Sequence, residues 1–470
     1  MSEKSNYIEL IERKYNEYNW IELEKMGFKK NEDYCFIYSY PPVRALDSIC
    51  EDDLFVESKY GKLRESANLY IHIPYCTGKC TYCYFASVSC NNSNPILKKD
   101  YPKYLEFELG RILELSKSNP EIQSIHIGGG TPFLLNYEEI KDIMNFIKKL
   151  KLKKNLEITI ESSPETINRD YSKLKKIKQL GINRISIGVE SLSDKVLELM
   201  NRRHNSSATL KAIDKIIKSG FTNINVDLIY GLPEQSLEAW VETILTLEKI
   251  GIQSISAYRL RKHPKTDINI YKTSSFPSYE TCQKMQLAHG IILKDKEFLS
   301  SSSHKYARSK NKIQKQLENK RGLDNNQLVS IGCGAYGYIN STFFWNTRSL
   351  SKYKYLIKNK ILPVNIGQIL SKNEIMRKAI VIGLHTYKGI SIENYKTTFD
   401  ISPLDLFENE FFFLKKSNMV IINKEKIRLT ELGRFFTDEI SLLFYSKNIK
   451  NILRSQQLKY GMFWEKKDEN

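Results

Sequence analysis

Three cysteines, Cys76, Cys80 and Cys83, lie within eight residues, separated by three and then by two residues. Thiolates this close together on one loop can hold three corners of an iron–sulfur cluster, which leaves one iron open to a small molecule with an amine and a carboxylate. Zinc is the alternative, because a structural zinc ion usually takes four protein ligands, and His72 or Cys90 would complete such a set. The spacing alone leaves both metals open.

Further groups with ligand chemistry follow the cysteines along the chain. The run Gly128-Gly129-Gly130 would let the backbone approach a ligand closely, since glycine has no Cβ, although glycines also make tight strand-to-helix turns. Glu161 and Glu190 each follow a short apolar run. We therefore expect each of these groups at the end of a strand.

Along the chain, short apolar or β-branched runs alternate with longer helical patterns, and these elements must position the candidate groups. The predicted strands are Leu69–Ile73, Ser124–Ile127, Leu156–Ile160, Arg184–Gly188, Asn223–Leu228 and Ser254–Tyr258. The predicted helices are Lys103–Ser116, Tyr137–Leu150, Tyr171–Leu180, Asp194–Met200, Ser207–Ser219 and Ser236–Ile250. This alternation predicts an α/β fold with a parallel sheet, and its repeats fit a partial (β/α)6 barrel. The candidate groups then stand at the C-terminal ends of successive strands, where such barrels gather their chemistry.

Four regions are predicted along the chain. Residues 1–65 form an N-terminal extension with an amphipathic helix around Tyr7–Lys25, and residues 66–300 form the barrel. After about Arg261 the alternation fades, residues 297–328 are interpreted as a long excursion, and residues 301–370 form a connecting region with a late glycine motif at 331–337. Residues 371–470 are predicted as a helical, winged-helix-like domain, whose two-stranded wing uses residues 420–422 and 427–430.

The amino-acid composition limits the classes of protein to which this chain can belong. The 470 residues are 41% hydrophobic and 27% charged, an ordinary balance for a globular protein, and no apolar run is long enough to span a membrane. The start has no signal sequence, so we expect a cytoplasmic protein. The net charge of +18 comes from short, scattered lysine runs such as Lys148-Lys149, which indicate a solvated surface. No nucleic-acid partner is expected, while an acidic small molecule remains possible as a ligand.

The isolated Cys35, Cys50 and Cys282 are interpreted as small buried hydrophobic residues.

Several motifs in this order resemble the radical S-adenosylmethionine (radical SAM) superfamily. The similarity is closest to the branch of oxygen-independent coproporphyrinogen III oxidase, with its heme-chaperone and methyltransferase-like relatives, and it covers about residues 66–440. The segments that carry it are 70–74, 76–83, 126–132, 184–191, 201–202, 227–233, 332–335 and 427–433. The resemblance implies a 4Fe–4S cluster on Cys76, Cys80 and Cys83, and reductive cleavage of S-adenosylmethionine to a 5′-deoxyadenosyl radical.

The resemblance also implies which residues bind one or two molecules of S-adenosylmethionine. The first molecule would contact Tyr70, Tyr82, Gly129, Gly130, Glu161 and Tyr336. The second would contact Thr131, Glu190, Arg202 and Asp227. Glu190 departs from the family, because the oxidase has a glutamine there. Asp227 could instead cap the loop at Gly231, and Arg202 could pair with Asp227.

Two departures bear on the substrate. The oxidase has a fourth cysteine where this chain has Tyr84-Phe85, and the heme chaperone has a His-Asn…Tyr-Trp motif that residues 320–328 lack. Residues 40–46 and 336–346 look more like the methyltransferase-like members, so we expect methyl or methylene transfer to a conjugated or tetrapyrrole-like substrate, with an electron donor such as flavodoxin or ferredoxin. Coproporphyrinogen decarboxylation and non-catalytic heme trafficking are the alternatives.

Overall fold

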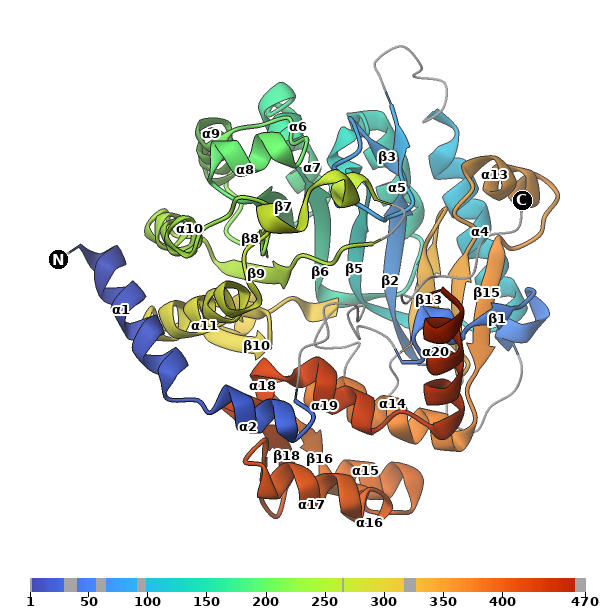
Figure 1. Cartoon of the computed structure of the whole chain (residues 1–470). Coiled ribbons are helices and arrows are strands. Elements are labelled where there is room, and N and C mark those ends of the chain that lie inside the picture. The colour runs from blue at the N-terminus through green and yellow to red at the C-terminus, as the bar shows by residue number, and fades with distance from the viewer. Residues whose placement is uncertain are drawn as a thin grey trace.

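In the computed structural model (Figure 1), the described residues are 2–28, 40–55, 65–90, 99–263, 266–316 and 327–460. Within them, 13 strands form one sheet in the order β1-β15-β14-β13-β12-β2-β5-β6-β7-β8-β9-β11-β10. Cys35 and residues 317–326 of the expected excursion lie outside the described residues.

The six predicted strands are confirmed as parallel neighbours at the centre of this sheet. They are β2 (Ser66–Ile73), β5 (Glu121–Gly129), β6 (Leu152–Ser162), β7 (Arg184–Glu190), β8 (Ile224–Tyr230) and β9 (Ser254–Arg259). The connecting helices are α4 (Tyr101–Ser116), α5 (Tyr137–Ile147), α6 (Pro164–Arg169), α7 (Lys173–Gln179), α8 (Asp194–Leu199), α9 (Ser206–Lys218) and α10 (Leu237–Lys249). The predicted α/β fold with a partial (β/α)6 barrel is therefore confirmed. The sequence pattern missed α6, a single short helix that starts at a proline.

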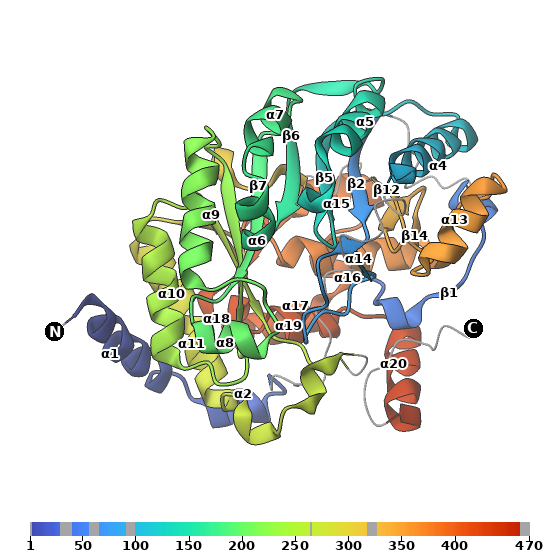
Figure 2. The ribbon, with the colours of Figure 1, turned by 90° about the horizontal axis from the view of Figure 1, so that it is seen from above.

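The two faces of the barrel strands differ in chemistry. Side chains alternate between faces along a strand, and the apolar set, such as Ile125 and Ile127, is buried under the helices seen around the sheet in Figure 2. The opposite, inner face is polar and internally hydrogen-bonded: Ser124 Oγ donates to Asn68 at 2.6 Å, and Asn225 Nδ2 donates to Ser186 Oγ at 2.9 Å. The candidate cofactor residues of the strands belong mostly to this inner face.

The sheet continues on both sides of the barrel strands. The prediction that residues 297–328 form a long excursion without strands is wrong at its start. Helix α11 (Tyr279–Asp295), β10 (Leu299–Ser302) and β11 (Lys305–Ala307) follow, with β11 antiparallel to β9. The sequence pattern concealed these strands because they are only four and three residues long, and β10, at the edge of the sheet, consists mainly of serine.

The expected connecting region supplies the other edge of the sheet. Strand β12 (Leu328–Ile331) runs parallel to β2, and it is followed by β13 (Tyr336–Ile339), β14 (Thr342–Asn346), helix α13 (Leu350–Lys358) and β15 (Val364–Ile369). Short β1 (Asp47–Ser48) pairs with β15. Residues 327–369 therefore extend the barrel sheet.

The C-terminal region has its own hydrophobic core, in keeping with the predicted winged-helix-like domain. Its helices are α14 (Lys372–Leu384), α15 (Ile392–Phe399), α16 (Pro403–Leu406), α17 (Glu408–Lys416), α18 (Glu431–Phe435), α19 (Thr437–Leu443) and α20 (Lys447–Tyr460). Strands β17 (Val420–Ile422) and β18 (Lys426–Leu429) form the predicted wing, and β16 (Ile390–Ser391) adds a third strand. The domain stretches beneath the sheet from β10 to β15 (Figure 1) and packs on Tyr338 and Phe343.

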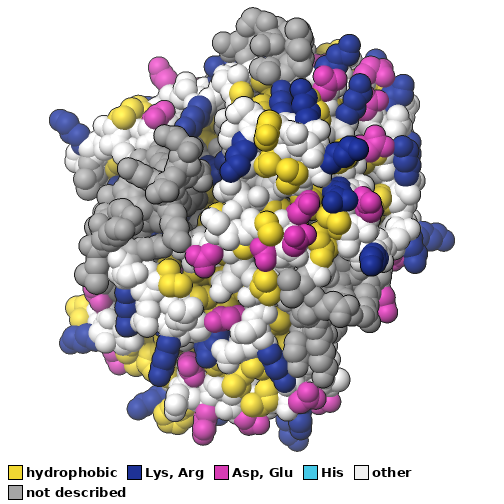
Figure 3. All heavy atoms as spheres, turned by 90° about the vertical axis from the view of Figure 1, so that its right-hand side faces the viewer, with side chains coloured by type: hydrophobic (Ala, Val, Ile, Leu, Met, Phe, Trp, Pro, Cys, Tyr) yellow, Lys and Arg dark blue, Asp and Glu magenta, His cyan; other side chains and the backbone are white. Residues whose placement is uncertain are grey.

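The N-terminal extension contacts both the barrel and the C-terminal domain. The single helix predicted around Tyr7–Lys25 is wrong: α1 (Glu3–Asn16) ends before α2 (Trp20–Lys25), because Asn19 caps the second helix by accepting the Glu22 N–H. Helix α1 packs on α10 and α11, whereas the Trp20 ring lies 5.3 Å from Phe435 of the C-terminal domain. No described helix is both long and apolar enough to cross a bilayer. On the face in Figure 3, basic side chains lie among acidic ones.

Candidate cofactor site

The three cysteines lie on the loop that leaves β2. Cys76 ends the short strand β3 (Tyr75–Cys76), which pairs with β4 (Val88–Ser89) beyond the loop, and all three side chains are partly exposed. Burial raises the pKa of Cys76 to about 11 and that of Cys83 to about 12. Both of these thiols therefore carry protons near neutral pH, and a metal group that binds them must displace those protons.

Gly130 packs tightly against the first of the three cysteines. A Cβ on Gly130 would lie 2.6 Å from the Tyr75 carbonyl oxygen and 2.9 Å from Cys76 Sγ. Thr131 donates its N–H to that carbonyl at 2.7 Å, and its Oγ1 lies 3.7 Å from Cys76 Sγ. Among the described residues, no three His, Cys, Asp or Glu side chains converge closely enough to hold one metal ion. Three separate thiols on one loop match the donor set of a 4Fe–4S cluster, in which each thiolate would bind a different iron.

Cys90 is not part of this exposed set. Its side chain is buried in the barrel's hydrophobic core, and its N–H donates to the Cys76 carbonyl at 2.8 Å. The residue therefore fixes the end of the cysteine loop through its backbone.

Glu161 organises the glycine turn at the end of β5. Its Oε1 lies 2.7 Å from His126 Nε2, and its Oε2 accepts the Gly129 N–H at 3.1 Å. Burial acts to raise the pKa of Glu161, but the hydrogen bond and charge of His126 together with the Gly129 N–H outweigh it, so the pKa lies below its ordinary value. Gly129 has φ +113°, and a Cβ there would lie 2.8 Å from the His72 ring. Both the backbone angle and the space require glycine.

Two tyrosines line the same part of the inner face. The Tyr70 ring lies 5.9 Å from the His126 ring and 5.7 Å from that of Tyr336, and the Tyr70 hydroxyl lies 3.0 Å from His72 Nδ1. Tyr336 also contacts the Trp345 ring on β14. Aromatic faces from β2, β13 and β14 therefore adjoin the Glu161 side of the site.

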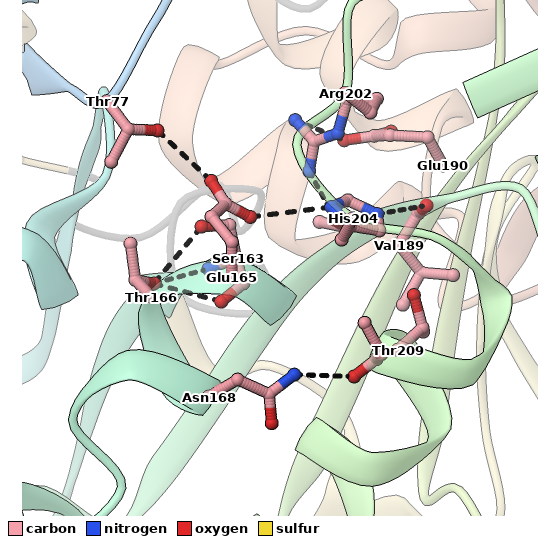
Figure 4. A network of polar contacts seen from close by, with 12 residues as sticks. Thr77, Ser163, Glu165, Thr166, Asn168, Val189, Glu190, Arg202, His204 and Thr209 are labelled. Carbon is pink, nitrogen blue, oxygen red and sulfur yellow. Dashed lines mark hydrogen bonds and ion pairs between the residues drawn. The ribbon is translucent and has the colours of Figure 1, made fainter. Parts of the chain in front are cut away.

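Arg202 joins the cysteine loop to the end of β7 (Figure 4). Its Nη2 donates to the Gly188 carbonyl at 2.6 Å, while its Nη1 lies 3.3 Å from Cys80 Sγ and 3.5 Å from the Tyr82 hydroxyl. Nη1 is also 3.8 Å from Glu190 Oε1. The guanidinium thus places a fixed positive charge between a cluster cysteine and a buried carboxyl group.

Glu190 stands in a strained part of β7. Its φ of 65° lies in the left-handed region, next to a register shift between Gly188 and Glu190. Such a conformation is disfavoured for a residue with a Cβ and is often found where a side chain must be aimed at a ligand. Burial raises the pKa of Glu190 to about 7, although the charge of Arg202 opposes this.

Glu165, at the start of α6, supports the same arginine from the other side (Figure 4). Thr77 of the cysteine loop donates to its Oε1 at 3.2 Å, and its Oε2 lies 3.4 Å from His204 Nδ1. His204 Nε2 lies 3.4 Å from the Val189 carbonyl. Burial acts to raise the pKa of Glu165, but His204 and the charge of Arg202 outweigh it and lower the pKa to about 2.

The remaining candidate residue of the strands is Asp227. Asp227 accepts hydrogen bonds from Ser186 Oγ at 2.7 Å and Asn225 Nδ2 at 3.0 Å, so strands β7 and β8 satisfy it rather than the loop at Gly231. The alternative in which Arg202 pairs with Asp227 is not what the structure has, because the arginine forms its ion pair with Glu190. The predicted residues therefore fall into a Cys76–Thr131 group, a Cys80–Arg202–Glu190 group, a Glu161 group and Asp227.

Sequence reasoning assigned no role to three residues of the site, His126, Glu165 and His204. His126 could have been found from strand alternation, since it is two residues before Gly128 and so shares its face. Nothing in the local sequence marks Glu165 or His204, because Glu165 lies on α6 and His204 in the loop between α8 and α9, and only the fold brings them together.

Comparison with known proteins agrees with this geometry. The family model described as the radical SAM superfamily matches residues 70–247, and that of the HemN C-terminal domain matches residues 370–436. The chain is 34% identical over 305 residues to the heme chaperone HemW of Buchnera aphidicola subsp. Acyrthosiphon pisum, covering 65% of this chain and 76% of that protein. The chain belongs to the radical SAM superfamily. Within it, the chain belongs to the branch that holds the heme chaperones and the oxygen-independent coproporphyrinogen III oxidases.

Two further relatives of this branch match this chain over most of their own length. The heme chaperone HemW of Bacillus subtilis is 29% identical, covering 79% of this chain and 97% of its own. The oxygen-independent coproporphyrinogen III oxidase of Synechocystis is 23% identical, covering 86% and 91%. The solved structure of coproporphyrinogen III oxidase (HemN) from Escherichia coli superposes with a TM-score of 0.75 at 21% identity, over 87% of this chain and 96% of that one. That similarity establishes a shared fold. Membership of the radical SAM superfamily implies a 4Fe–4S cluster and S-adenosylmethionine.

Proposed function

We propose that this chain is a heme-binding protein of the heme-chaperone kind that carries a 4Fe–4S cluster on Cys76, Cys80 and Cys83 and binds S-adenosylmethionine. The observation that carries the proposal is similarity over nearly the whole length of relatives named heme chaperone, 97% of one and 98% of another. The family's cysteine loop is present in this chain beside the buried Arg202.

The inner face of the barrel supplies the groups that would hold the cofactors. The three thiols would bind the cluster, Arg202 would face a carboxylate, and Glu161 would stand beside the glycine turn that approaches the cofactor. When bound, the cluster and S-adenosylmethionine would supply one-electron reduction chemistry at the sulfonium. The chain's own part is to orient the two groups and to exclude water from the polar inner face.

The expected methyl transfer has no support among the relatives, and the heme-binding alternative is the better supported of the two. Decarboxylation of coproporphyrinogen is the second candidate, since one relative of similar length is an oxygen-independent coproporphyrinogen III oxidase. Tyr84-Phe85 stands against it, because the oxidase has its fourth cysteine there.

The proposal is tested by titrating the anaerobically reconstituted protein with hemin and following the Soret band, with S-adenosylmethionine and a reductant present in a parallel sample. We expect one hemin per chain and little or no 5′-deoxyadenosine during uptake. Vinyl products from coproporphyrinogen would establish the oxidase reaction instead. S-adenosylhomocysteine formed together with 5′-deoxyadenosine would establish methyl transfer, and a protein that binds no hemin would refute the proposal.

A further inference from the structure

A glutamine outside the barrel strands reaches a residue on their inner face. Gln314 follows β11 in the chain, and its Nε2 lies 3.0 Å from His126 Nδ1. Its Oε1 accepts a hydrogen bond from Lys305 Nζ of β11 at 3.1 Å. Both ends of the Gln314 amide are therefore engaged, one by the edge of the sheet and one by the ring that contacts Glu161.

The backbone holds Gln314 in this place from both sides. Ile313, before it, is buried, and the N–H of Lys315, after it, donates to Glu157 Oε1 at 2.9 Å. Glu157 and Glu161 are four residues apart on β6 and share one face of the strand. The segment is therefore fixed along the same inner face as the candidate cofactor carboxylate.

Lys305 decides which way round the Gln314 amide stands. An ammonium group has donors only, so the amide atom that faces it must be the oxygen. The amide nitrogen then faces His126 Nδ1, which must accept. The proton of the neutral imidazole is therefore on Nε2, which lies 2.7 Å from Glu161 Oε1 and donates to it.

The contact at Nδ1 controls what Glu161 meets. Without it, the ring could carry its proton on Nδ1 and turn a bare nitrogen toward the carboxylate. His126 can support Glu161 by its charge only when the ring holds a second proton, and that proton would point at the amide N–H of Gln314. Gln314 therefore favours the form of the ring that supports Glu161 by a hydrogen bond.

Glu161 is the member of this chain of contacts that a ligand can reach. Its side chain keeps 35% of its surface exposed, against 11% for that of His126. We propose that Gln314 is a positioning residue for S-adenosylmethionine, which holds Glu161 in place as an acceptor by fixing the His126 ring. The inference rests on the proposed function and deepens it, because it adds a residue outside the barrel strands to the cofactor site.

The test measures S-adenosylmethionine affinity by equilibrium dialysis on the anaerobically reconstituted full chain. Gln314→Met removes both polar ends of the amide at similar length, and Gln314→Glu keeps the reach but offers Nδ1 only an acceptor. Gln179→Met, exposed on α7, is the matched control. Iron analysis and thermal unfolding follow the cluster and the fold in each variant. In parallel, ¹⁵N NMR of the histidine-labelled, cluster-free chain shows which ring nitrogens carry protons, with His126 assigned by its loss in His126→Phe.

We expect Gln314→Met to bind S-adenosylmethionine about fivefold more weakly, the equivalent of one hydrogen bond, with its iron and fold retained. Gln179→Met should bind as wild type. In the spectra, wild-type His126 should carry its proton on Nε2 alone, and Gln314→Glu should add a proton at Nδ1 at the same pH.

Three results would overturn the positioning role while leaving cofactor binding intact. They are a wild-type His126 with its proton on Nδ1, wild-type affinity in a folded Gln314→Met, and a loss of affinity that is matched by a loss of iron. Wild type that binds no S-adenosylmethionine would instead refute the proposed function, and the positioning role with it.

Discussion

Arg202 is flanked by two buried glutamates that the fold treats in opposite ways. On the α6 side, Glu165 is engaged by Thr77 and His204, and its pKa is lowered to about 2. On the β7 side, Glu190 is 3.8 Å from the arginine, has a left-handed backbone, and has its pKa raised to about 7. Burial disfavours the charged form of both carboxyl groups, so the difference comes from their neighbours: His204 and Arg202 lower the pKa of Glu165, whereas the charge of Asp227 adds to burial at Glu190. Glu165 therefore supports the cysteine loop. Glu190 keeps a raised pKa and a strained backbone, which are typical of a residue that binds a ligand.

The largest contrast is expected from removing each carboxyl group in turn. Glu165→Ala should lower the free energy of unfolding at pH 5 by about 2 to 3 kcal/mol, because it leaves the buried His204 without its carboxylate and Thr77 without its acceptor. At the same pH, Glu190→Gln should change it by less than about 1 kcal/mol, because a neutral amide of similar size replaces a carboxyl group that is mostly protonated there. Urea unfolding of the cluster-free, reduced protein measures both values. Similar losses in the two variants would mean that the glutamates are equivalent.

A smaller contrast concerns pH. Glu190 and Glu108, whose pKa is also raised by burial to about 7, hold protons more tightly in the folded chain than in the unfolded chain. The stabilisation from each is complete below pH 4.5 and is lost as the pH rises through 7. The reverse holds for Glu165, which stabilises above pH 4.5 and loses that effect as the pH falls toward 2.

We therefore expect wild-type stability to fall between pH 5 and pH 8, and Glu190→Gln to reduce that fall by about 2 kcal/mol. Glu108→Gln serves as the comparison outside the cofactor site, since Glu108 is held by Gly332, Asn346 and Tyr353. Urea midpoints at the two pH values give the measurement. An unaltered pH slope in Glu190→Gln would show that this carboxyl group titrates normally.

The smallest effect is expected at the cluster itself. Arg202 Nη1 lies 3.3 Å from Cys80 Sγ, and a positive donor at a ligand sulfur favours the reduced cluster. Arg202→Gln should make the midpoint potential about 40 mV more negative, the equivalent of roughly 1 kcal/mol for one electron. Lys195→Gln, on the exposed surface nearby, is the control. A potential unchanged in Arg202→Gln would place the arginine's role with the cofactor alone.

The sequence predicted the barrel because its strands repeat a simple pattern of apolar residues under helices. It did not predict β10 and β11, since these strands are only four and three residues long and carry too few apolar residues for the pattern to show. Among the candidate site residues, the cysteines and glycines were visible because neighbours in sequence are neighbours in space. The Glu165–His204 contact was not, because its members come from α6 and from the loop between α8 and α9. The left-handed backbone of Glu190 arises from a one-residue irregularity in strand pairing, which composition does not reveal.

The central claim is that Cys76, Cys80 and Cys83 hold a cluster whose open iron meets S-adenosylmethionine. It is tested most directly by electron paramagnetic resonance of the anaerobically reconstituted, reduced protein, recorded with and without S-adenosylmethionine and alongside iron analysis. We expect about four irons per chain, a reduced-cluster spectrum that S-adenosylmethionine changes, and loss of both in Cys76→Ser but not in Cys50→Ser. A Cys76→Ser protein that keeps its iron, or a wild-type spectrum indifferent to S-adenosylmethionine, would contradict the claim.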